Sequence, residues 1–515
     1  MKKLAAFLLG LAAAVPAAAE LTPAEQRGKA IYFKGESVSG REILAVIGDS
    51  GTEVPAAVMT CSSCHGRDGR GRPEGGVYPS DLTWPALTKP YGVEHASGRR
   101  HPPYSEKSLV RAIAMGVDPA GNRLHVGMPS YRMAHEDMAD LIAYIQRLGE
   151  DLDPGLTDDA ITLATMLPKD RPLEGVGAAM EAVMRAYFDD VNEQGGIYHR
   201  RLELEVVPAV GTSAARAADL DRLLESDAVF ALAGVFLAGA EDELLAVVEE
   251  HEIPLVGPYT LDPRIDFHAP NPYVFYLLPG IKDLARSLVS FAKVEDGPPH
   301  SAVLAGTDPI LVAAADEVVR KAAELGWPEV RQVTVGPGEL DIETLAKEAL
   351  DPVFLLVAGD GQTAFLKRAA ELGWHPRVLV PGTLMEREIF AAPPGFADRI
   401  FAAFPTLPSN HDPRSVSEYR RLAEHYRLPA EHVAVQVTTL ASARVLVEGL
   451  KQAGRQLSRG RLIEVLEGLS EFDTGLTPPV SYSPNRRIGV RGAYVLAIGL
   501  EGGKMMPASG WIDSR

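Results

Sequence analysis

Two cysteines three positions apart, followed at once by a histidine, constrain this chain more than any other feature. They form the pentapeptide Cys61-Ser62-Ser63-Cys64-His65, and no other cysteine occurs in the 515 residues. Thiols at this spacing can add to the two vinyl groups of a haem, and the adjacent histidine can then ligate the iron. We therefore predict one covalently attached haem c, bonded to Cys61 and Cys64, with His65 as an axial ligand.

Three other uses of two nearby cysteines have to be weighed against haem attachment. An exported chain could join them in a disulfide, and a Cys-x-x-Cys pair can carry out thiol redox chemistry at a strand-to-helix junction of an α/β unit. A zinc site would need further cysteines or a spaced pair of histidines. The segment is not part of an α/β unit, the chain has no further cysteine, and His65 follows directly, so haem attachment is favoured.

Residues 1–19 have the composition of an export signal. Two lysines follow the first residue, residues 4–15 are apolar, and residues 17–19 are alanines suited to cleavage. The apolar run is shorter than the roughly 20 residues that span a membrane, and no later run is long and apolar enough to span one. We therefore expect a soluble mature protein in the periplasm, without a membrane span.

Length and charge limit the classes of fold and partner. A chain of 515 residues is too long for one ordinary core, so several domains are expected. With 46% hydrophobic and 23% charged residues, the composition is that of a globular protein. The formal net charge of −18 argues against a nucleic-acid partner, because phosphate binding needs a basic surface.

The sequence around the haem motif predicts an all-α domain over residues 20–150. Helical spacing of apolar residues marks 22–33, which contains the small Gly28, and 135–148. With the haem motif, these segments resemble the class I cytochrome c domain, whose first and last helices cross beside the haem. In that family a methionine just before the last helix, usually followed by proline, is the sixth ligand. The resemblance implies this role for Met128, which precedes a proline.

Other side chains remain candidates for the sixth ligand. Met133 lies close to the start of the last helix, Met138 is expected on its buried face, and Met115 is expected to pack inside an earlier helix. His125 is a conceivable ligand, although a position at the surface or the haem edge is the simpler interpretation. A thioether opposite histidine raises the reduction potential relative to two histidines and suits electron transfer.

The pattern changes after the acidic segment 151–159, which contains Pro154-Gly155 and is predicted to be a linker. β-rich and helical segments then alternate in two successive runs, which predicts two lobes with parallel doubly wound sheets. Ligands bind beyond the carboxyl ends of such strands, so a cleft between the lobes is expected. The predicted strands are 161–167, 202–207, 229–234, 254–256, 301–305, 329–335, 353–357 and 378–381. The predicted helices are 175–194, 214–225, 241–250, 310–325, 341–349 and 363–372.

The second domain is expected to cover residues 160–515. Its stretch 187–204 reads Tyr-Phe-Asp-Asp-Val-Asn-Glu-Gln-Gly-Gly-Ile-Tyr-His-Arg-Arg-Leu-Glu-Leu. This is similar to the end of the first helix in type I periplasmic solute-binding proteins of the leucine/isoleucine/valine-binding group. Segments 167–175, 227–234, 253–256 and 271–275 resemble further parts of that family. The resemblance implies a two-lobed protein that binds a small solute by domain closure.

The resemblance also indicates where a ligand would bind. Amino-acid-binding members hold the ligand carboxylate with Ser or Thr side chains and backbone amides after the third and fourth strands. Here no hydroxyl follows the third strand near Phe236, and the fourth is followed by Tyr259 and Thr260. Glu386 lies near the position of an acid that binds the ammonium group. Phe236, Tyr259, Thr260 and Glu386 are the candidate ligand-binding residues, and a solute less polar than an amino acid is favoured.

No catalytic constellation is found in the sequence. The histidines beyond the first domain are scattered without a nucleophile or metal spacing, and the glycine-rich stretches lack a phosphate-loop Lys-Ser/Thr. We expect no enzyme, but a mono-haem c-type cytochrome that exchanges electrons with a periplasmic partner such as a dehydrogenase or terminal oxidase. Its second domain would bind an unidentified small molecule. The alternative is a solute receptor of an ABC-type importer or sensor, in which the haem domain reports redox state.

Overall fold

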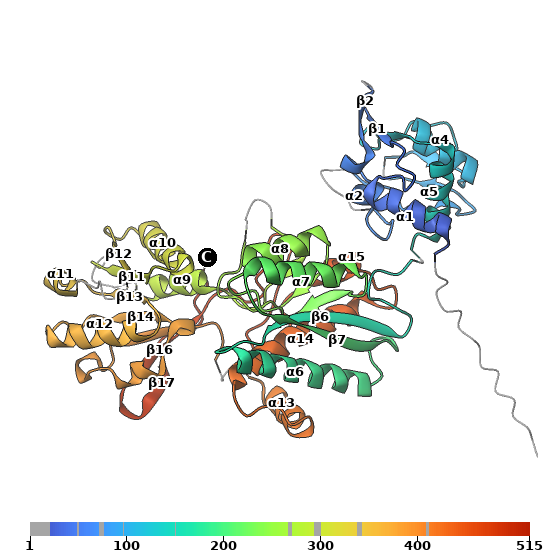
Figure 1. Ribbon diagram of the computed structural model, residues 1–515. Coiled ribbons are helices and arrows are strands. Elements are labelled where there is room, and N and C mark those ends of the chain that lie inside the picture. Colours follow the sequence, from blue (N-terminus) through green and yellow to red (C-terminus); the bar gives the residue numbers. More distant parts are fainter. Residues whose placement is uncertain are drawn as a thin grey trace, which may run out of the picture. The chain divides into compact units, whose positions relative to one another are not determined.

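The computed structural model describes residues 21–48, 51–71, 77–95, 97–149, 151–265, 270–292, 300–336, 342–407 and 411–514. The predicted export signal, residues 1–19, lies outside this part of the chain. The chain divides into two compact units, Met1–Asp159 and Ala160–Arg515, which are described separately (Figure 1).

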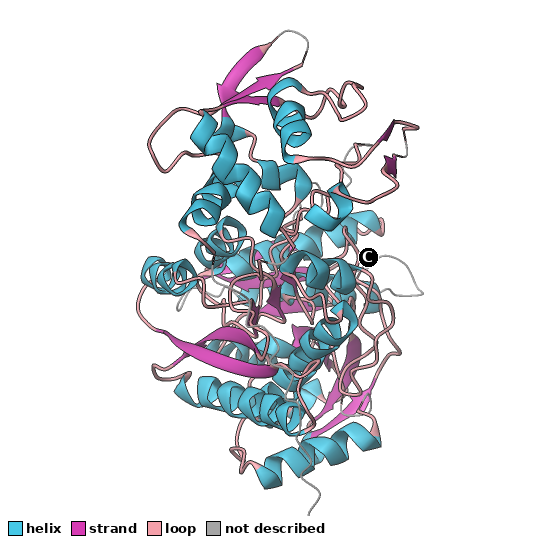
Figure 2. Cartoon of the chain, turned by 90° about the vertical axis from the view of Figure 1, so that its right-hand side faces the viewer, coloured by secondary structure: helices cyan, strands magenta, loops and turns pink. Residues whose placement is uncertain are grey.

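The first unit is built mainly from helices, with short strands at its edges (Figure 2). The helices are α1 (Pro23–Lys34), α2 (Cys61–His65), α3 (Trp84–Leu87), α4 (Glu106–Met115), α5 (His135–Arg147) and the 3-10 helix η1 (Ala56–Val58). α1 begins at a capping box, in which the Thr22 hydroxyl accepts the N–H of Glu25 and the Glu25 carboxylate accepts the N–H of Thr22. The first and last helices form within one or two residues of their predicted bounds.

Helices α1 and α5 cross at Gly28. A Cβ atom at this position would lie 2.0 Å from the backbone oxygen of Asp140. Beside the crossing, Arg27 donates hydrogen bonds of 2.7 and 2.9 Å to the Asp140 carboxylate. The buried rings of Tyr32 and Tyr144 pack with their centroids 5.6 Å apart. The predicted close packing at Gly28 is therefore present, and it leaves no room for a side chain.

Two small antiparallel sheets accompany these helices, which the all-α prediction did not include. β1 (Leu44–Ile47) pairs with β2 (Thr52–Pro55) and β5 (Ser130–Arg132), and β3 (Val93–Glu94) pairs with β4 (Arg100–His101). These strands have two to four residues, too few for the alternation of apolar and polar residues that reveals a strand in a sequence. β5 reaches β1 from a distant part of the chain, so this pairing depends on the tertiary fold.

The acidic residues of the predicted linker pair with side chains of the first unit. Asp151 accepts a hydrogen bond of 2.9 Å from the hydroxyl of Tyr144 and forms an ion pair of 2.8 Å with Lys29. Asp153 lies 3.5 Å from the Arg67 guanidinium. The start of this segment is therefore fixed to the helical unit and is not free chain.

The second unit begins with a parallel sheet in the order β10-β9-β8-β6-β7. Its strands are β6 (Ala160–Pro168), β7 (Arg201–Ala209), β8 (Ala231–Ala233), β9 (Leu255–Val256) and β10 (Val274–Phe275). Helices α6 (Glu174–Glu193), α7 (Ser213–Glu225) and α8 (Glu241–Glu250) alternate with them. The strands β8, β9 and β10 are buried throughout, as is typical of parallel sheets covered on both faces.

The second lobe contains a larger sheet in the order β12-β11-β13-β14-β15-β16-β17. Its strands are β11 (Ala302–Gly306), β12 (Arg331–Val335), β13 (Val353–Leu356), β14 (Val378–Pro381), β15 (Ile400–Phe404), β16 (Tyr494–Gly499) and β17 (Lys504–Pro507). Strands β11 to β15 pair in parallel, and β16 and β17 add antiparallel pairs. The helices of this lobe are α9 (Ile281–Phe291), α10 (Pro309–Glu324), α11 (Ile342–Lys347) and α12 (Asp360–Glu371). Shorter 3-10 helices are η2 (Gly382–Leu384), η3 (Arg387–Ala391), η4 (Pro394–Phe396) and η6 (Glu501–Gly503).

After β15 the chain returns to the first lobe. It forms α13 (Pro413–His425), α14 (Val433–Ala453) and α15 (Arg459–Glu467), and α14 packs against α6 and α15. Beyond residues 1–19, no run long and apolar enough to span a membrane was expected from the sequence. Of the helices in the described ranges, α14 alone nevertheless has that length and composition, although 67% of its most apolar window is buried inside the protein. Such burial is typical of a core helix, and α14 also contacts the strands β8 and β9 of the first lobe.

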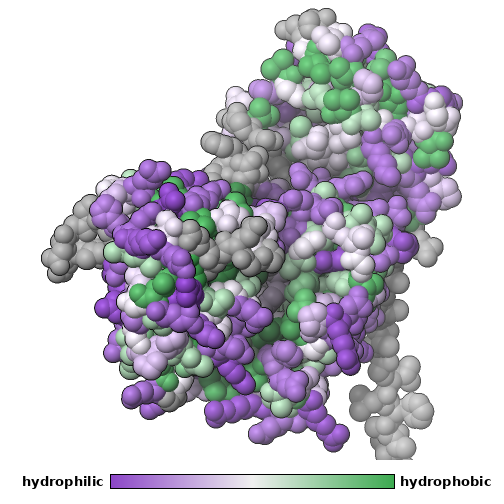
Figure 3. Space-filling model, turned by 60° about the vertical axis from the view of Figure 1, so that its left-hand side comes forward, coloured by the Kyte–Doolittle hydropathy of each residue, from purple (hydrophilic) through white to green (hydrophobic). Residues whose placement is uncertain are grey.

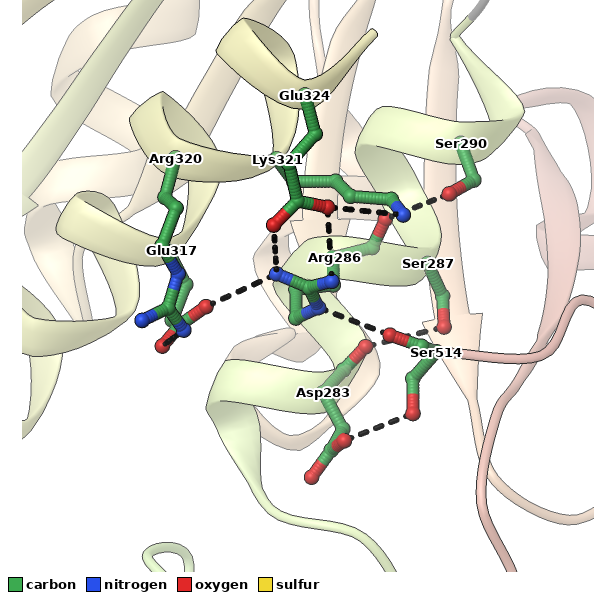
Figure 4. A network of polar contacts seen from close by, with 9 residues as sticks. All are labelled: Asp283, Arg286, Ser287, Ser290, Glu317, Arg320, Lys321, Glu324 and Ser514. Atoms are coloured by element: carbon green, nitrogen blue, oxygen red, sulfur yellow. Dashed lines mark hydrogen bonds and ion pairs between the residues drawn. The ribbon is translucent and has the colours of Figure 1, made fainter. Parts of the chain in front are cut away.

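A polar network connects α9, α10 and the residues after β17 (Figure 4). Arg286 of α9 donates a hydrogen bond of 2.8 Å to the backbone oxygen of Ser514 and forms ion pairs with Glu317 and Glu324 of α10. The Ser514 hydroxyl donates to the Asp283 carboxylate at 2.7 Å. Burial raises the pKa of Asp283. The network joins residues more than 200 positions apart in the sequence.

Candidate functional site

The predicted haem-attachment residues lie on the short helix α2. Cys61 and Cys64 are free thiols, and their separation of three positions places both on the same side of the helix. Cys64 is exposed and Cys61 is partly buried. Burial raises the pKa of the Cys61 thiol to about 12. Both sulfur atoms are thus available for thioether bonds from one helical turn.

His65 has the orientation that an axial ligand requires. Its side chain is 6% exposed, and its Nδ1 lies 2.9 Å from the backbone oxygen of Ser80. A carbonyl oxygen can only accept, so Nδ1 carries the proton and Nε2 keeps its lone pair. Burial lowers the pKa of His65, which favours the neutral ring that can bind a metal. The donor set therefore fits the predicted haem iron.

The Met128 segment is joined to the haem motif by hydrogen bonds and packing. Tyr131, on the strand that follows Met128, donates from its buried hydroxyl to the backbone oxygen of Met59 at 2.7 Å. Met59 lies two residues before Cys61. Burial raises the pKa of Tyr131, and the two nearby cysteines add to the increase. The fold thus joins the strand that follows the candidate sixth ligand to the residues just before the attachment helix.

Partly buried apolar side chains, among them Cys61 and Met128, pack against the core of the first unit. They are Leu21, Phe33, Val54, Met59, Cys61, Leu82, Trp84, Tyr104, Met128 and Met133. An apolar surface that is only partly covered is what a haem needs for its largely apolar macrocycle. These surroundings, like the orientation of His65, fit the predicted cofactor.

The alternative ligands differ in position. Met138 is 8% exposed on α5, as predicted, and belongs to the core of the first unit. Met115, expected to pack inside its helix, is 69% exposed at the end of α4, because that position faces away from the core. His125 is exposed, and its Nδ1 accepts the N–H of Gly127 at 3.1 Å. Met133 is partly buried against the same core as Met128.

The second unit contains a cavity of about 200 Å³ between its lobes. From the first lobe it is lined by residues after β9 and β10, by Met180 of α6, and by α14; from the second lobe it is lined by residues after β14 and β15. Figure 3 shows a largely hydrophilic outer surface with hydrophobic residues in the recess of this unit. The lining residues are Met180, Gly257, Pro258, Tyr259, Thr260, Leu261, Leu277, Leu278, Pro279, Gly280, Ile281, Thr383, Pro405, Thr406, Ala434, Val435, Thr438, Thr439 and Ser442.

A second recess of about 300 Å³ lies on the first lobe among α6, α13 and α14. Its lining is polar, but the guanidinium of Arg444 in this lining already has hydrogen-bond partners. Arg444 donates to the hydroxyl of Ser415 at 2.9 Å, to the backbone oxygen of Thr474 at 2.6 Å and to the Glu418 carboxylate at 2.8 Å. The interlobe cavity, which lies at the carboxyl ends of the strands, is therefore the better candidate for a ligand site.

Comparison with known families agrees with this geometry. Residues 160–504 match the model of the periplasmic binding protein family. The chain belongs to this family. Residues 51–149 match the cytochrome c family, so a cytochrome c domain precedes the periplasmic binding protein domain. Both predicted resemblances are thereby confirmed. Within the described residues, no group of three or more His, Cys, Asp and Glu side chains could hold a separate metal ion.

Solved structures share the fold of the periplasmic binding protein domain at low sequence identity. The fatty acid ABC transporter substrate-binding protein from Thermomonospora curvata is 18% identical with a TM-score of 0.56, and the match covers 70% of this chain and 95% of that one. A branched chain amino acid ABC transporter from Thermus thermophilus with bound valine is 17% identical with a TM-score of 0.55, covering 69% and 97%. A leucine binding protein from Thermotoga maritima is 16% identical with a TM-score of 0.53, covering 69% and 99%. No curated protein matches the chain.

The four candidate ligand-binding residues of the periplasmic binding protein domain have different positions. Tyr259 and Thr260 line the cavity. Phe236 is 7% exposed and stacks on the ring of Tyr259, with the centroids 5.7 Å apart, so it lies behind the wall. Glu386 is exposed before η3, and its N–H donates to the side-chain oxygen of Gln362 at 3.5 Å. Neither Phe236 nor Glu386 is among the residues that line the cavity.

Several lining residues could not be chosen from the sequence. Thr439 and Ser442 belong to α14, and Thr383 and Thr406 follow strands of the second lobe. The Thr-Thr pair and the nearby serine within the apolar run of α14 are a weak signal, because small polar residues also occur in ordinary core helices. Asp308, which follows the first strand of the second lobe, caps α10 by accepting the N–H of Ile310 at 2.9 Å.

Proposed function

We propose that this protein is a periplasmic mono-haem c-type cytochrome that transfers electrons and binds a small molecule in its second domain. The electron-transfer half rests on His65, whose Nδ1–H is bonded to Ser80 so that Nε2 can ligate iron. A bound haem c supplies a one-electron redox couple.

The residues around the attachment helix hold and orient the haem in this proposal. Cys61 and Cys64 form the covalent bonds, and the Ser80 carbonyl fixes the ring of His65. Met128 is the proposed sixth ligand, held near the motif by the bond from Tyr131 to Met59. If His65 and Met128 both bound the iron of a haem, no position would remain open for oxygen, which would favour electron transfer over oxygen chemistry. We therefore propose a non-enzymatic role.

The ligand-binding half of the proposal rests on the interlobe cavity. Residues from both lobes line it, so closure of one lobe on the other would enclose a solute. The solved relatives include a protein named for fatty acids and one with bound valine. Tyr259 and Thr260 are the predicted ligand-binding residues that lie at this cavity.

Location and partners follow from the two domains. The periplasmic binding protein family and the predicted export signal, residues 1–19, both favour the periplasm. A redox partner such as a dehydrogenase or terminal oxidase would exchange electrons with the haem. The negative net charge of −18 continues to argue against nucleic acid as a partner.

A receptor role is the second candidate function. It is favoured by the family, because one solved relative is named as an ABC transporter substrate-binding protein and another as a branched chain amino acid ABC transporter. In that case the second domain delivers a solute to an importer or sensor, and the haem domain reports redox state. Stopped-flow reduction of the haem by a periplasmic dehydrogenase separates the two roles, since a receptor requires no rapid electron exchange.

The axial ligation is tested with Met128→Ala and the matched variant Met133→Ala in the haem-loaded protein. We expect Met128→Ala to convert the low-spin absorption spectrum to a high-spin one, because the iron loses its sixth ligand, and Met133→Ala to leave the spectrum unchanged. A changed spectrum in Met133→Ala alone would reassign the ligand to Met133. Unchanged spectra in both variants would contradict His/Met ligation.

A further inference from the structure

A buried carboxylate lies directly behind the wall of the interlobe cavity. Glu241, the first residue of α8, is 5% exposed. One of its oxygens accepts the hydroxyl of Thr260 at 2.8 Å, and the other accepts the N–H of Gly239 at 3.0 Å. Thr260 follows β9 and lines the cavity, and Gly239 follows β8. The chain's own carboxylate therefore binds a donor from each of two neighbouring strand ends.

The N-terminus of α8, where Glu241 lies, is the kind of position at which a parallel α/β fold is best suited to bind an anion. The N–H groups at a helix N-terminus and the positive end of the helix dipole favour negative charge there, and it lies beyond the carboxyl ends of the strands. Arg216 of α7, which is 7% exposed, donates to the backbone oxygens of Ala238, at 2.9 Å, and of Phe236. The loop after β8 is thus held by Arg216, and its anion site is filled by Glu241.

The remaining lining of the cavity suits a ligand without charge. Among the described residues that line it, none is charged. Thr439 of α14 is 3% exposed, and its hydroxyl has no hydrogen-bond partner. A buried hydroxyl without a partner is unfavourable, and a ligand that pairs with it removes this penalty. By contrast, the hydroxyl of Thr260 already donates to Glu241 and accepts the N–H of Asp262 at 3.0 Å.

We infer that the cavity takes an uncharged, largely apolar solute with a polar group that pairs with Thr439, and that Glu241 is the residue that excludes carboxylates. The inference rests on the proposed binding function and names its ligand class. A ligand carboxylate would find the two donors already paired with Glu241, and it would lose its hydration in a cavity whose described lining residues include no cation. A neutral solute meets neither obstacle.

The size of the cavity determines the probes. At about 200 Å³ it exceeds the apolar cavity of about 150 Å³ that is known to hold benzene. Benzyl alcohol, toluene and benzoate each contain one benzene ring. They differ in its substituent, which is an alcohol in the first, a methyl group in the second and a carboxylate in the third. Titration calorimetry of the haem-loaded, full-length protein measures the Kd of each probe. We expect benzyl alcohol to bind at least about tenfold more tightly than benzoate.

Two variants test the assigned roles. Glu241→Ala frees the N–H of Gly239 and the hydroxyl of Thr260, so we expect benzoate affinity to rise at least about tenfold. Thr439→Val removes the unpaired hydroxyl at nearly constant volume, so benzyl alcohol should bind about fivefold more weakly while toluene is unaffected. Thr165→Val is the matched control, because Thr165 is also buried with an unpartnered hydroxyl but does not line the cavity.

The outcomes separate the inference from the function on which it rests. Benzoate binding to the unaltered protein as tightly as benzyl alcohol would overturn the inference and leave a solute-binding role intact. No heat from any probe, with the haem spectrum normal, would overturn both the inference and the ligand-binding half of the proposed function. A gain of benzoate affinity in Glu241→Ala, with toluene unchanged, supports the role of Glu241 even if Thr439→Val does not fold.

Discussion

The two candidate sites of this protein are constructed in opposite ways. The haem-attachment residues are contiguous, and they occupy one short helix, Cys61–His65. The interlobe cavity draws on segments between Met180 and Ser442, from both lobes. A contiguous site is defined by the spacing of residue types, whereas an assembled cavity exists only once distant segments have packed. Substitutions of the cysteines in the haem-attachment helix should therefore abolish haem attachment. Substitutions around the cavity should instead alter the stability of the second unit or the shape of the cavity.

The largest effect is expected from replacing both thiols. Cys61→Ser with Cys64→Ser removes the atoms that form the covalent bonds, so haem should be lost completely under denaturing conditions. Haem staining after denaturing electrophoresis measures this, and Ser62→Ala, between the two cysteines, is the control that keeps the stain. The melting transition of the second unit should be unchanged, and a shift of that transition would show that the two units do not fold independently.

A large effect on the stability of the second unit is expected from replacing Arg459. This residue of α15, 5% exposed, donates to the backbone oxygens of Val229 at 2.6 Å, Phe230 at 3.1 Å and His251 at 3.1 Å. Arg459→Met leaves these oxygens without that donor, which should lower the free energy of unfolding by about 3 kcal/mol or more.

The control for Arg459 lies two positions away. Arg461 is exposed and pairs with Glu464 on the same helix, so Arg461→Met should change stability by less than about 0.5 kcal/mol. Urea unfolding, followed by circular dichroism for the second unit and by haem absorbance for the first, measures both variants. Equal effects of the two substitutions would mean that the hydrogen bonds from Arg459 to Val229, Phe230 and His251 do not contribute to the stability of the second unit.

In the first unit the sharpest packing test is Gly28→Ala. The new Cβ would lie 2.0 Å from the backbone oxygen of Asp140, so the two helices must move apart, and we expect a loss of about 1–3 kcal/mol. Ala139→Ser, on the exposed side of α5, is the control with little effect. The haem transition in urea reports the change, and equal stability of Gly28→Ala would contradict the close crossing.

The smallest effect concerns pH and the network around Asp283. Burial raises the pKa of this carboxyl in the folded protein above its ordinary value, so the folded state holds the proton more tightly. Its contribution to stability is therefore present below the ordinary pKa and is lost as pH rises through the folded pKa. Asp283→Asn should remove this dependence and raise stability near pH 7 by about 1 kcal/mol or less.

Urea midpoints at several pH values measure the effect at Asp283. The exposed Asp189 supplies the control substitution Asp189→Asn, which removes a carboxylate outside the network around Asp283. A profile of Asp283→Asn that parallels the unaltered protein would show that Asp283 is not the source of the dependence.

Regular elements were predicted well where apolar periodicity is strong and local. The bounds of α8 and β14 agree with the sequence prediction, α5 differs by one residue at its C-terminal end, and α6 differs by one residue at each end. No element after Pro381 was predicted, although β15, α14 and β16 follow there. These segments pack by contacts with earlier parts of the chain, so their buried faces are set by the fold and not by a repeating local pattern.

The candidate sites also combine features that the local sequence predicted with features that only the structure shows. The spacing of Cys61, Cys64 and His65 identified the haem motif, but the carbonyl partner of His65, fifteen positions away at Ser80, required the structure. Met115 was expected to pack inside its helix, yet its side chain is exposed to solvent. At the cavity, the sequence pointed to residues after β9, whereas the role of Glu241 depends on two strand ends that meet in space.

The sequence by itself determined the alternation of strands and helices, and it predicted the haem attachment of the first domain and the export signal, because each of these patterns lies in residues close together along the chain. Only the tertiary structure decided which side chains line the cavity, and that Glu241 fills the place where an anion could bind. Burial and hydrogen-bond partners depend on contacts between segments far apart in the sequence, and the order of residues alone does not specify those distances.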